Sequence, residues 1–413
     1  MRIVELTINA FDEFANTHPL RNYCQSSAYA RFMGEMGYSY DYIGYEDDSR
    51  NLVAASLILY KRIGTVHKYA YAPKGFLIDY YNVELLKSFI KDITKRYKSR
   101  KVIFLKINPE IIIGEVKIKN NFACDYNQNV KIIDDLKDLK FKRRREAQPL
   151  ELIMPRISPY INLKKYDEKK LNDEFQTTLN YSQHKGLILE DAPASDINVF
   201  HDLVKSHTNQ NLSYFRNLLN IFDKTDMADL LLVKVDYREF LIQAKENYEQ
   251  ELENNNLCNE RIKDDASETN LNLKMESDRL LLQLKNNIVE ATEGLKKRES
   301  HHIAGALVVK YLNRITIIID GYDEAYAHLY PYHFLYQKMI EKYREGFDYL
   351  DLNGISADLD PNSTHYNNNQ FKLGFNPIVY EFIGEFDIIT DEISFKRLQG
   401  RDIISKEMYN QKV

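Results

Sequence analysis

The sequence predicts an α/β (α+β) fold with two lobes and a helical hairpin arm inserted into the second lobe. Strand and helix patterns alternate on both sides of a boundary at Phe141–Pro159, which combines the basic run FKRRR with three prolines. The chain has 413 residues, more than one ordinary core accommodates, and 44% of them are hydrophobic. Residues 238–300 stand apart because they are highly charged and follow a heptad spacing.

Residues 1–150 are expected to form the first lobe, joined by the C-terminal segment 387–413. Apolar and β-branched runs predict its strands, and apolar residues at helical spacing predict its helices. The expected elements are strand Arg2–Leu6, helix Ala28–Met36, strands Tyr40–Tyr45, Leu52–Tyr60 and Lys68–Ala72, helix Val83–Lys98 and strand Lys101–Ile107. Pro109 stops the last of these strands.

Residues 151–237 and 301–386 are expected to form the second lobe, which repeats the first in outline. A polar loop from Asn353 to Phe371 separates its last strands. The expected strands are Tyr160–Leu163, Leu187–Leu189, Leu230–Val235, Ile303–Val309, Arg314–Ile319, Tyr349–Leu352 and Val379–Phe386, and the expected helices are Glu168–Gln183, Ser195–Thr208, Tyr214–Phe222, Pro331–Arg344 and one within Glu392–Asn410. Two similar lobes predict a cleft between them, the usual place for a substrate.

The arm is predicted over residues 238–300. Its apolar seam has 3-4-3-4 spacing at Leu281, Leu284, Ile288, Ala291 and Leu295. The turn is expected in the polar middle, so two helices of roughly 25 residues would extend about 35 Å. The spacing fits a pair of helices that only braces the lobe as well as an arm that contacts a partner.

Composition and missing motifs exclude several classes of function. The net charge is −5, so any nucleic acid must be met by a local basic patch. Three widely spaced cysteines favour a reducing cytosol, and neither a signal peptide nor a membrane-spanning run is expected, so we predict a cytoplasmic protein. Phosphate-loop, dinucleotide, zinc-protease and serine-elbow motifs are missing. We therefore predict no cofactor and no metal; His301–His302 is more typical of a polar turn.

Several segments, in order, resemble the Fem family of peptidoglycan bridge-forming aminoacyltransferases. The strongest is FKLGFNPIVYEFIGEF (Phe371–Phe386), preceded by YHFLYQKMIEKYREGFDYLDLNGIS (Tyr332–Ser356). The first lobe contributes CQSSAYARFMGEMGY, KYAYAPKGFLIDY and FLKINPE. The resemblance implies two acetyltransferase-like lobes, the second with a coiled-coil arm whose candidate role is contact with aminoacyl-tRNA. It implies transfer of an amino acid from aminoacyl-tRNA to the stem-peptide amine of a lipid-linked or nucleotide-linked peptidoglycan precursor.

The resemblance also implies site residues. Lys372 matches the lysine of the family's Phe-Lys segment, which makes it the candidate catalytic residue, an electrostatic stabiliser of the reaction. Its alternative reading is a solvated lysine at a strand edge. The candidate substrate-binding residues are Arg31, Lys74, Tyr214, Arg216 and Gly374. We also expect the protein to form a homo- or hetero-dimer with Fem-like proteins and to contact a membrane peripherally.

Departures from the family pattern leave other functions open. Met33 stands where the family often has a lysine, Gln210 stands where an arginine commonly precedes the tyrosine, and the helix around LNYSQHK is less basic than usual. A phosphate-rich acceptor requires cations, which Arg143–Arg145, Lys74 and Lys185 could supply. The alternatives are a non-catalytic Fem-like partner or tRNA-binding subunit without an acceptor site, and a related transferase that acts on another amine.

Overall fold

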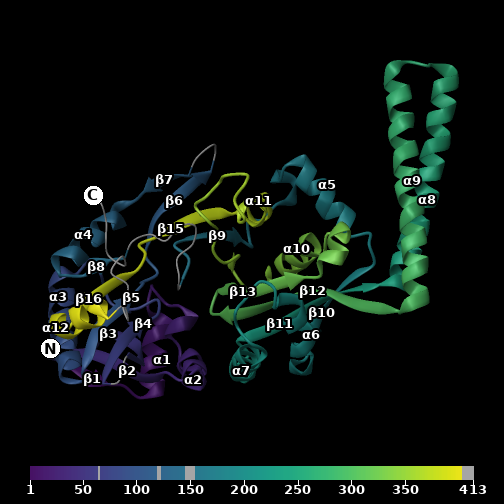
Figure 1. Ribbon diagram of the computed structural model, residues 1–413. Coiled ribbons are helices and arrows are strands. Elements are labelled where there is room, and N and C mark those ends of the chain that lie inside the picture. Colours follow the sequence, from purple (N-terminus) through teal and green to yellow (C-terminus); the bar gives the residue numbers. More distant parts are fainter. Residues whose placement is uncertain (64–65, 119–121, 145–153, 402–413) are drawn as a thin grey trace.

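The computed structural model describes residues 1–63, 66–118, 122–144 and 154–401. Arg145 and Pro149 of the predicted boundary, and the part of the predicted C-terminal helix beyond Arg401, lie outside the described residues. The described chain forms two mixed sheets with helices packed on them, and a long helical hairpin that projects from the second sheet (Figure 1). The predicted fold class is thus found in the structure.

The first sheet has seven strands within the described residues. In spatial order they are β1 (Arg2–Glu5), β2 (Ser39–Glu46), β3 (Leu52–Ile63), β4 (His67–Ala72), β5 (Val102–Ile107), β16 (Phe386–Ile389) and β8 (Lys142–Arg143). The β4–β5 pair is parallel, and the other pairs are antiparallel. The chain crosses between β4 and β5 through α3 (Val83–Ser99), whose apolar face is buried.

The second sheet has nine strands within the described ranges. Their spatial order is β10 (Leu187–Ala192), β11 (Ala228–Asp236), β12 (Ser300–Tyr311), β13 (Arg314–Tyr322), β14 (Tyr349–Asp351), β9 (Ile157–Asn162), β15 (Ile378–Phe382), β6 (Ile112–Ile118) and β7 (Phe122–Tyr126). Here too a single pair is parallel, β13 with β14. Each described sheet therefore carries one parallel pair in an otherwise antiparallel array.

Hydrogen bonding does not follow the expected lobe boundary at residue 150. The hairpin β6–β7 belongs to the first 150 residues but pairs with β15 in the second sheet. Pro109 has no backbone N–H to donate to a ladder, and β5 ends at Ile107, just before it. Strand β16, most of which belongs to the C-terminal segment expected to join the first lobe, pairs with β5 and β8 in the first sheet.

Helices cover both sheets, and one cluster of buried residues joins the two lobes. Ala28 and Phe32 of α2 pack with Phe222 of α7 and with buried residues of the second sheet. Helix α2 is Ser27–Glu35 and helix α7 is Leu212–Asp223. The other described α-helices of the lobes, besides α3, are α1 (Ile8–Thr17), α4 (Lys131–Asp138), α5 (Asp173–Ser182), α6 (Ile197–Val204), α10 (Pro331–Tyr343), α11 (Tyr366–Gly374) and α12 (Glu392–Gly400). This shared apolar core fixes the lobes against each other.

The projecting hairpin consists of α8 (Tyr237–Asp264) and α9 (Glu268–Lys297), which lie side by side (Figure 1). Asp236 caps α8 by accepting from the backbone N–H groups of Arg238 and Glu239. At the base, Gly294 has room for no side chain, because a Cβ there would lie 2.1 Å from the ring of Tyr237. The hairpin is therefore anchored by close packing where it leaves the second sheet.

Among the described helices, none is both long and apolar enough to cross a lipid bilayer.

Candidate functional site

The parallel strand pair of the second sheet diverges beside the candidate catalytic residue. β13 and β14 pair from Arg314–Tyr349 to Thr316–Asp351, where β14 ends, while β13 continues to Tyr322. The chain turns away after Asp351, and Asn353 adopts the left-handed conformation in this turn, with a φ of 64°. Helix α11 lies next to this turn and directs Lys372 at it. A site at the ends of diverging strands is a usual location for a ligand.

Lys372 is buried, with only 6% of its surface exposed, and its ammonium donates to the carbonyl of Gly354 over 3.1 Å. Burial lowers the pKa of Lys372, and the charges of Asp320 and Asp351 oppose that shift only in part. An ammonium has three N–H donors. Within the described residues the two others have no hydrogen-bond partner. Lys372 is therefore a buried cation with unused donors.

The structure corrects the expected environment of this lysine. The segment predicted as a loop up to Phe371 is helical from Tyr366, so Lys372 lies in the last turn of α11 and not at a strand edge. Asn369 stabilises this helix in spite of the low helix propensity of asparagine. Its amide accepts from the backbone N–H of Ser356 (3.0 Å) and donates to the carbonyl of the same residue (2.9 Å).

Gly374 serves the packing of α11. A Cβ at this position would lie 2.2 Å from the ring of Phe175 on α5, so only glycine permits the contact between the two helices. The rings of Phe175 and Phe375 meet edge to face, with centroids 4.8 Å apart. Gly374, a residue predicted from the sequence, therefore lies at the contact between α5 and α11, two residues after Lys372.

A polar layer extends from Lys372 toward the first lobe. Asp351 accepts from the hydroxyl of Ser158 (2.8 Å) and from the backbone N–H of Asn353 (3.0 Å). Tyr160 is the partner of Asp351 on the neighbouring strand β9. The hydroxyl of Tyr160 donates to Glu110 (3.3 Å), a residue of the first lobe that follows β5. The hydrogen bond from Tyr160 to Glu110 thus joins this strand of the second sheet to the first lobe.

Glu110 and Arg314 form the centre of the contact between lobes. Both guanidinium nitrogens of Arg314 donate to the carboxylate of Glu110, and Asn22 donates to it as well (2.6 Å). Burial alone would raise the pKa of Glu110, but the charges of Arg314 and Lys74 hold it below its ordinary value. Glu110 is therefore a carboxylate at neutral pH.

A cavity of about 300 Å³ opens beside this ion pair. Its lining comes from both lobes and includes Arg21, Glu110, Tyr160, Arg314, Tyr380 and Phe382. The sequence-predicted Lys74 lies next to it: its ammonium is 5.0 Å from the ring centroid of Phe382, and its backbone N–H donates to Asn108 (2.8 Å). The cavity is thus an inter-lobe pocket with aromatic walls and charges of both signs.

The other three sequence-predicted residues lie where α2 meets α7. Arg31 is exposed on α2, and its neighbour Phe32 packs edge to face on Tyr214 at 5.1 Å. Burial raises the pKa of the Tyr214 phenol to about 12. Arg216 is exposed and donates to Asn198 over 3.3 Å. The structure records no contact between these residues and Lys372 or Lys74.

Glu110, Tyr160, Arg314 and Asp351 were missed by the sequence reasoning. Glu110 stands in the FLKINPE segment directly after a buried strand and a proline, which is a place where a charge at a site is often found. Arg314 opens an apolar strand, and Asp351 ends one. These positions at strand ends were the available signal, but sequence alone does not show that they converge.

The geometry defines the class of protein: a two-lobed α/β fold with a buried lysine at diverging strands and a pocket between the lobes. The model of the FemAB family matches residues 6–400, so the chain belongs to this family. The crystal structure of FemX superposes with a TM-score of 0.76 at 19% identity, covering 97% of this chain and all of that one, which shows that the two proteins share a fold.

Curated relatives give the same result. A protein of Staphylococcus aureus described as a lipid II:glycine glycyltransferase is 24% identical over 97% of this chain and 95% of its own length. A protein of the same description from Staphylococcus epidermidis is 22% identical over 95% of this chain and 94% of its own length. The enzyme class expected from the sequence, an aminoacyltransferase, is confirmed by these matches.

Proposed function

We propose that the protein transfers an amino acid from aminoacyl-tRNA to the stem-peptide amine of a lipid-linked peptidoglycan precursor, and so builds the interpeptide bridge. The observation that carries this proposal is Lys372, a buried ammonium with unused N–H donors at the end of diverging strands. The names of the staphylococcal relatives, which specify lipid II and glycine, support the acceptor class.

The reaction needs little more than orientation and stabilisation of charge. The acceptor ammonium first loses one proton to solvent, and the neutral amine then attacks the carbonyl carbon of the aminoacyl ester. A C–N bond forms as the carbonyl π bond opens, so the carbonyl oxygen becomes negative. The ester C–O bond then breaks, and the ribose oxygen leaves with the proton that the amine gives up. We assign to Lys372 the stabilisation of the oxyanion, because a preorganised cation in a buried site is effective at that task.

The acceptor is assigned to the pocket between the lobes. An amine approaches as an ammonium at neutral pH, and the carboxylate of Glu110 attracts it while Arg314 and Lys74 attract the carboxylates or phosphates of the same molecule. The polar layer through Tyr160 and Asp351 links this pocket to Lys372. Donor and acceptor would therefore approach each other along that layer.

The test uses the purified chain with lipid II and tRNA charged in turn with glycine, alanine and serine. We expect the stem peptide to gain one residue with at least one of the charged tRNAs, and none with the uncharged tRNA. Loss of transfer in Lys372→Met with retained binding of lipid II supports the assigned role. Absence of transfer from every charged tRNA contradicts the proposal, and absence of lipid II binding as well favours the non-catalytic subunit without an acceptor site.

A further inference from the structure

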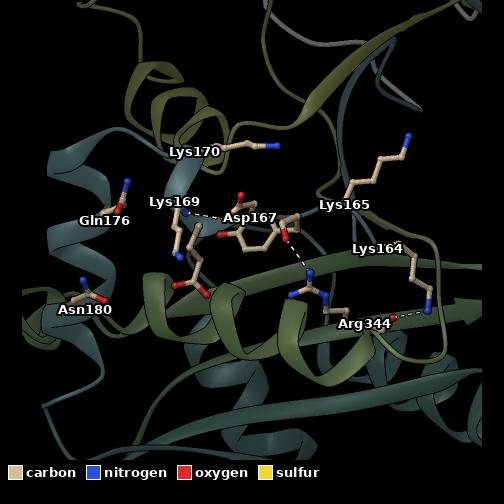
Figure 2. A pocket seen from close by; sticks show the side chains of 10 residues that line it. Lys164, Lys165, Asp167, Lys169, Lys170, Gln176, Asn180 and Arg344 are labelled. Carbon is tan, nitrogen blue, oxygen red and sulfur yellow. Dashed lines mark hydrogen bonds between the residues drawn. The ribbon is translucent and has the colours of Figure 1, made fainter.

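A basic cavity of about 590 Å³ lies in the second lobe, outside the site described above. It is formed by the KKYDEKK segment after β9, by Gln176 and Asn180 of α5, and by Arg344 at the end of α10 (Figure 2). Four lysines and one arginine line it, against two acidic residues. The chain as a whole has a net charge of −5, so this local excess of positive charge opposes the overall field.

Two of the cations build the wall of the cavity. The ammonium of Lys164 donates to the carbonyls of Arg344 (2.6 Å) and Glu345 (2.7 Å), where it meets the negative end of the α10 dipole. The guanidinium of Arg344 donates to the carbonyl of Tyr166 (3.0 Å), as Figure 2 shows. These hydrogen bonds to backbone carbonyls fix the shape of the cavity, so Lys164 and Arg344 have a structural role even when no ligand is bound.

The two acidic residues are engaged elsewhere. Asp167 caps the 3-10 helix Glu168–Lys170 by accepting from the backbone N–H of Lys169 (3.1 Å). Glu168 accepts from the side-chain amide of Gln337 on α10. Neither carboxylate forms an ion pair with the cavity lysines within the described part of the chain.

The remaining cations, Lys165, Lys169 and Lys170, are exposed. Among the described residues, none of the three forms an ion pair or a side-chain hydrogen bond. Figure 2 shows these three side chains extending from one segment in different directions. Three unpaired ammonium groups around one cavity fit a ligand that carries several anionic oxygens.

The cavity is connected to the catalytic lysine through one helix. Phe175 of α5 packs on Gly374 and Phe375 of α11, and the next residue, Gln176, lines the cavity. The aminoacyl ester lies at the 3′ end of its RNA, so phosphodiester groups lead away from the reacting carbonyl. A strand that delivers the ester near Lys372 needs cations along its path, and single-stranded nucleic acid is held by such positive grooves.

The arm is a poorer candidate for this contact. Between Tyr237 and Lys297 the chain has thirteen acidic and nine basic residues. We propose that the cavity of Lys165, Lys169 and Lys170 binds RNA phosphodiester groups of the aminoacyl-tRNA donor. This inference rests on the proposed function for the identity of the RNA, whereas binding of RNA at this place can be measured without transfer.

The test compares Lys165→Gln/Lys169→Gln/Lys170→Gln with a control triple, Lys87→Gln/Lys91→Gln/Lys95→Gln. The control residues are exposed on α3 of the first lobe, so both variants lose the same charge. Affinity for uncharged tRNA is measured with the full chain at salt concentrations from about 50 to about 200 mM. We expect the cavity variant to bind on the order of tenfold more weakly, with a salt slope smaller in magnitude by about 2.

The kinetics give a second readout. We expect the cavity variant to raise KM for aminoacyl-tRNA and to leave kcat and KM for lipid II unchanged, while the control variant behaves as the parent. Wild-type tRNA affinity in the cavity variant overturns the inference, as does equal weakening in both variants. A rise in KM for lipid II alone also overturns it, since the cavity then binds the precursor's diphosphate. The parent chain can bind tRNA more tightly than the cavity variant and still transfer no amino acid. In that case the proposed function fails and this inference stands.

Discussion

The guanidinium of Arg314, at the start of a strand in the second sheet, contacts both carboxylate oxygens of Glu110, which follows a strand of the first sheet. The side chains are 20% and 8% exposed, so water screens the pair little. Because the contact joins residues 204 positions apart in the sequence, it couples the stability of the lobes to the shape of the pocket between them.

Replacement of Arg314 by Met is expected to destabilise the protein by about 3 kcal/mol, since it leaves the Glu110 carboxylate buried without its main partner. The pKa of Glu110 should rise, because burial then acts with less opposition. Urea unfolding of the variant measures the first effect. The double variant Glu110→Gln/Arg314→Met should recover much of the loss, because the unpaired charge is gone. Equal stability of the single and double variants would falsify this account of the pair.

Lys372 offers a prediction on rate and pH. Lys372→Met should lower kcat by on the order of 100-fold to 1,000-fold, the usual cost of losing a preorganised donor to an oxyanion. Since burial lowers the pKa of Lys372, transfer should decline as pH rises through that lowered value. Lys372→Arg keeps the charge at all pH values, so its residual activity should lack this decline. An identical alkaline limb in both proteins would assign the titration to another group.

Lys185 at the base of the arm predicts a pH dependence of stability. Its ammonium donates to Asn287 (2.8 Å) and contacts Tyr181 and Phe240, with Glu290 as the opposing charge, and burial lowers its pKa to about 8. The unfolded chain binds this proton up to a pKa of about 10.4, so between these values the unfolded state holds more protons. Stability should therefore rise with pH from about 8, by up to about 3 kcal/mol.

This prediction is tested by measuring the free energy of unfolding of the parent and of Lys185→Met from about pH 7.5 to about pH 10. This range spans the interval between the folded and unfolded pKa values of Lys185. The difference between the two proteins isolates Lys185 from other lysines, such as Lys106, whose pKa burial also lowers. A difference that does not change over this range would show that the pKa of Lys185 is ordinary.

Deletion of residues Gln250–Ser277 tests whether the arm contributes to tRNA binding. The deletion takes away seven acidic and three basic residues and leaves the packing of Tyr237 on Gly294 at the base. We expect the lobes to fold and the affinity for tRNA to stay within about twofold, because the removed segment repels phosphates. Circular dichroism and a tRNA titration check both points. Loss of tRNA binding in a folded deletion variant would assign RNA recognition to the arm.

The parts of this structure that follow a local pattern could be predicted from the sequence. Helical spacing identified α3 and the seam of Leu284 and Ala291, both of which are buried. The helix α11 was missed because its stability comes from the amide of Asn369 bonding to Ser356, a tertiary contact that opposes local propensity. The exchange of β6–β7 into the second sheet was missed for the same reason, since strand partners are non-local.

The candidate site was predicted only in part. Lys372 was predicted through resemblance to a family, and Lys74 as a cation for a phosphate-rich acceptor. Lys372 lies beside the diverging strands, and Lys74 lies beside the inter-lobe pocket. Glu110 and Arg314 could not be paired from sequence, because nothing local relates a residue after β5 to one at the start of β13. Gly374 was predicted as a substrate-binding residue, and the structure places the ring of Phe175 against it.

The measurement that tests the central claim most directly is the mass of lipid II after incubation with the purified chain and charged tRNA. We predict a precursor heavier by one amino-acid residue with the parent chain, a product reduced by on the order of 100-fold or more with Lys372→Met, and full binding of lipid II by both. An unchanged precursor with every charged tRNA, or equal transfer by the parent and by Lys372→Met, would contradict the account.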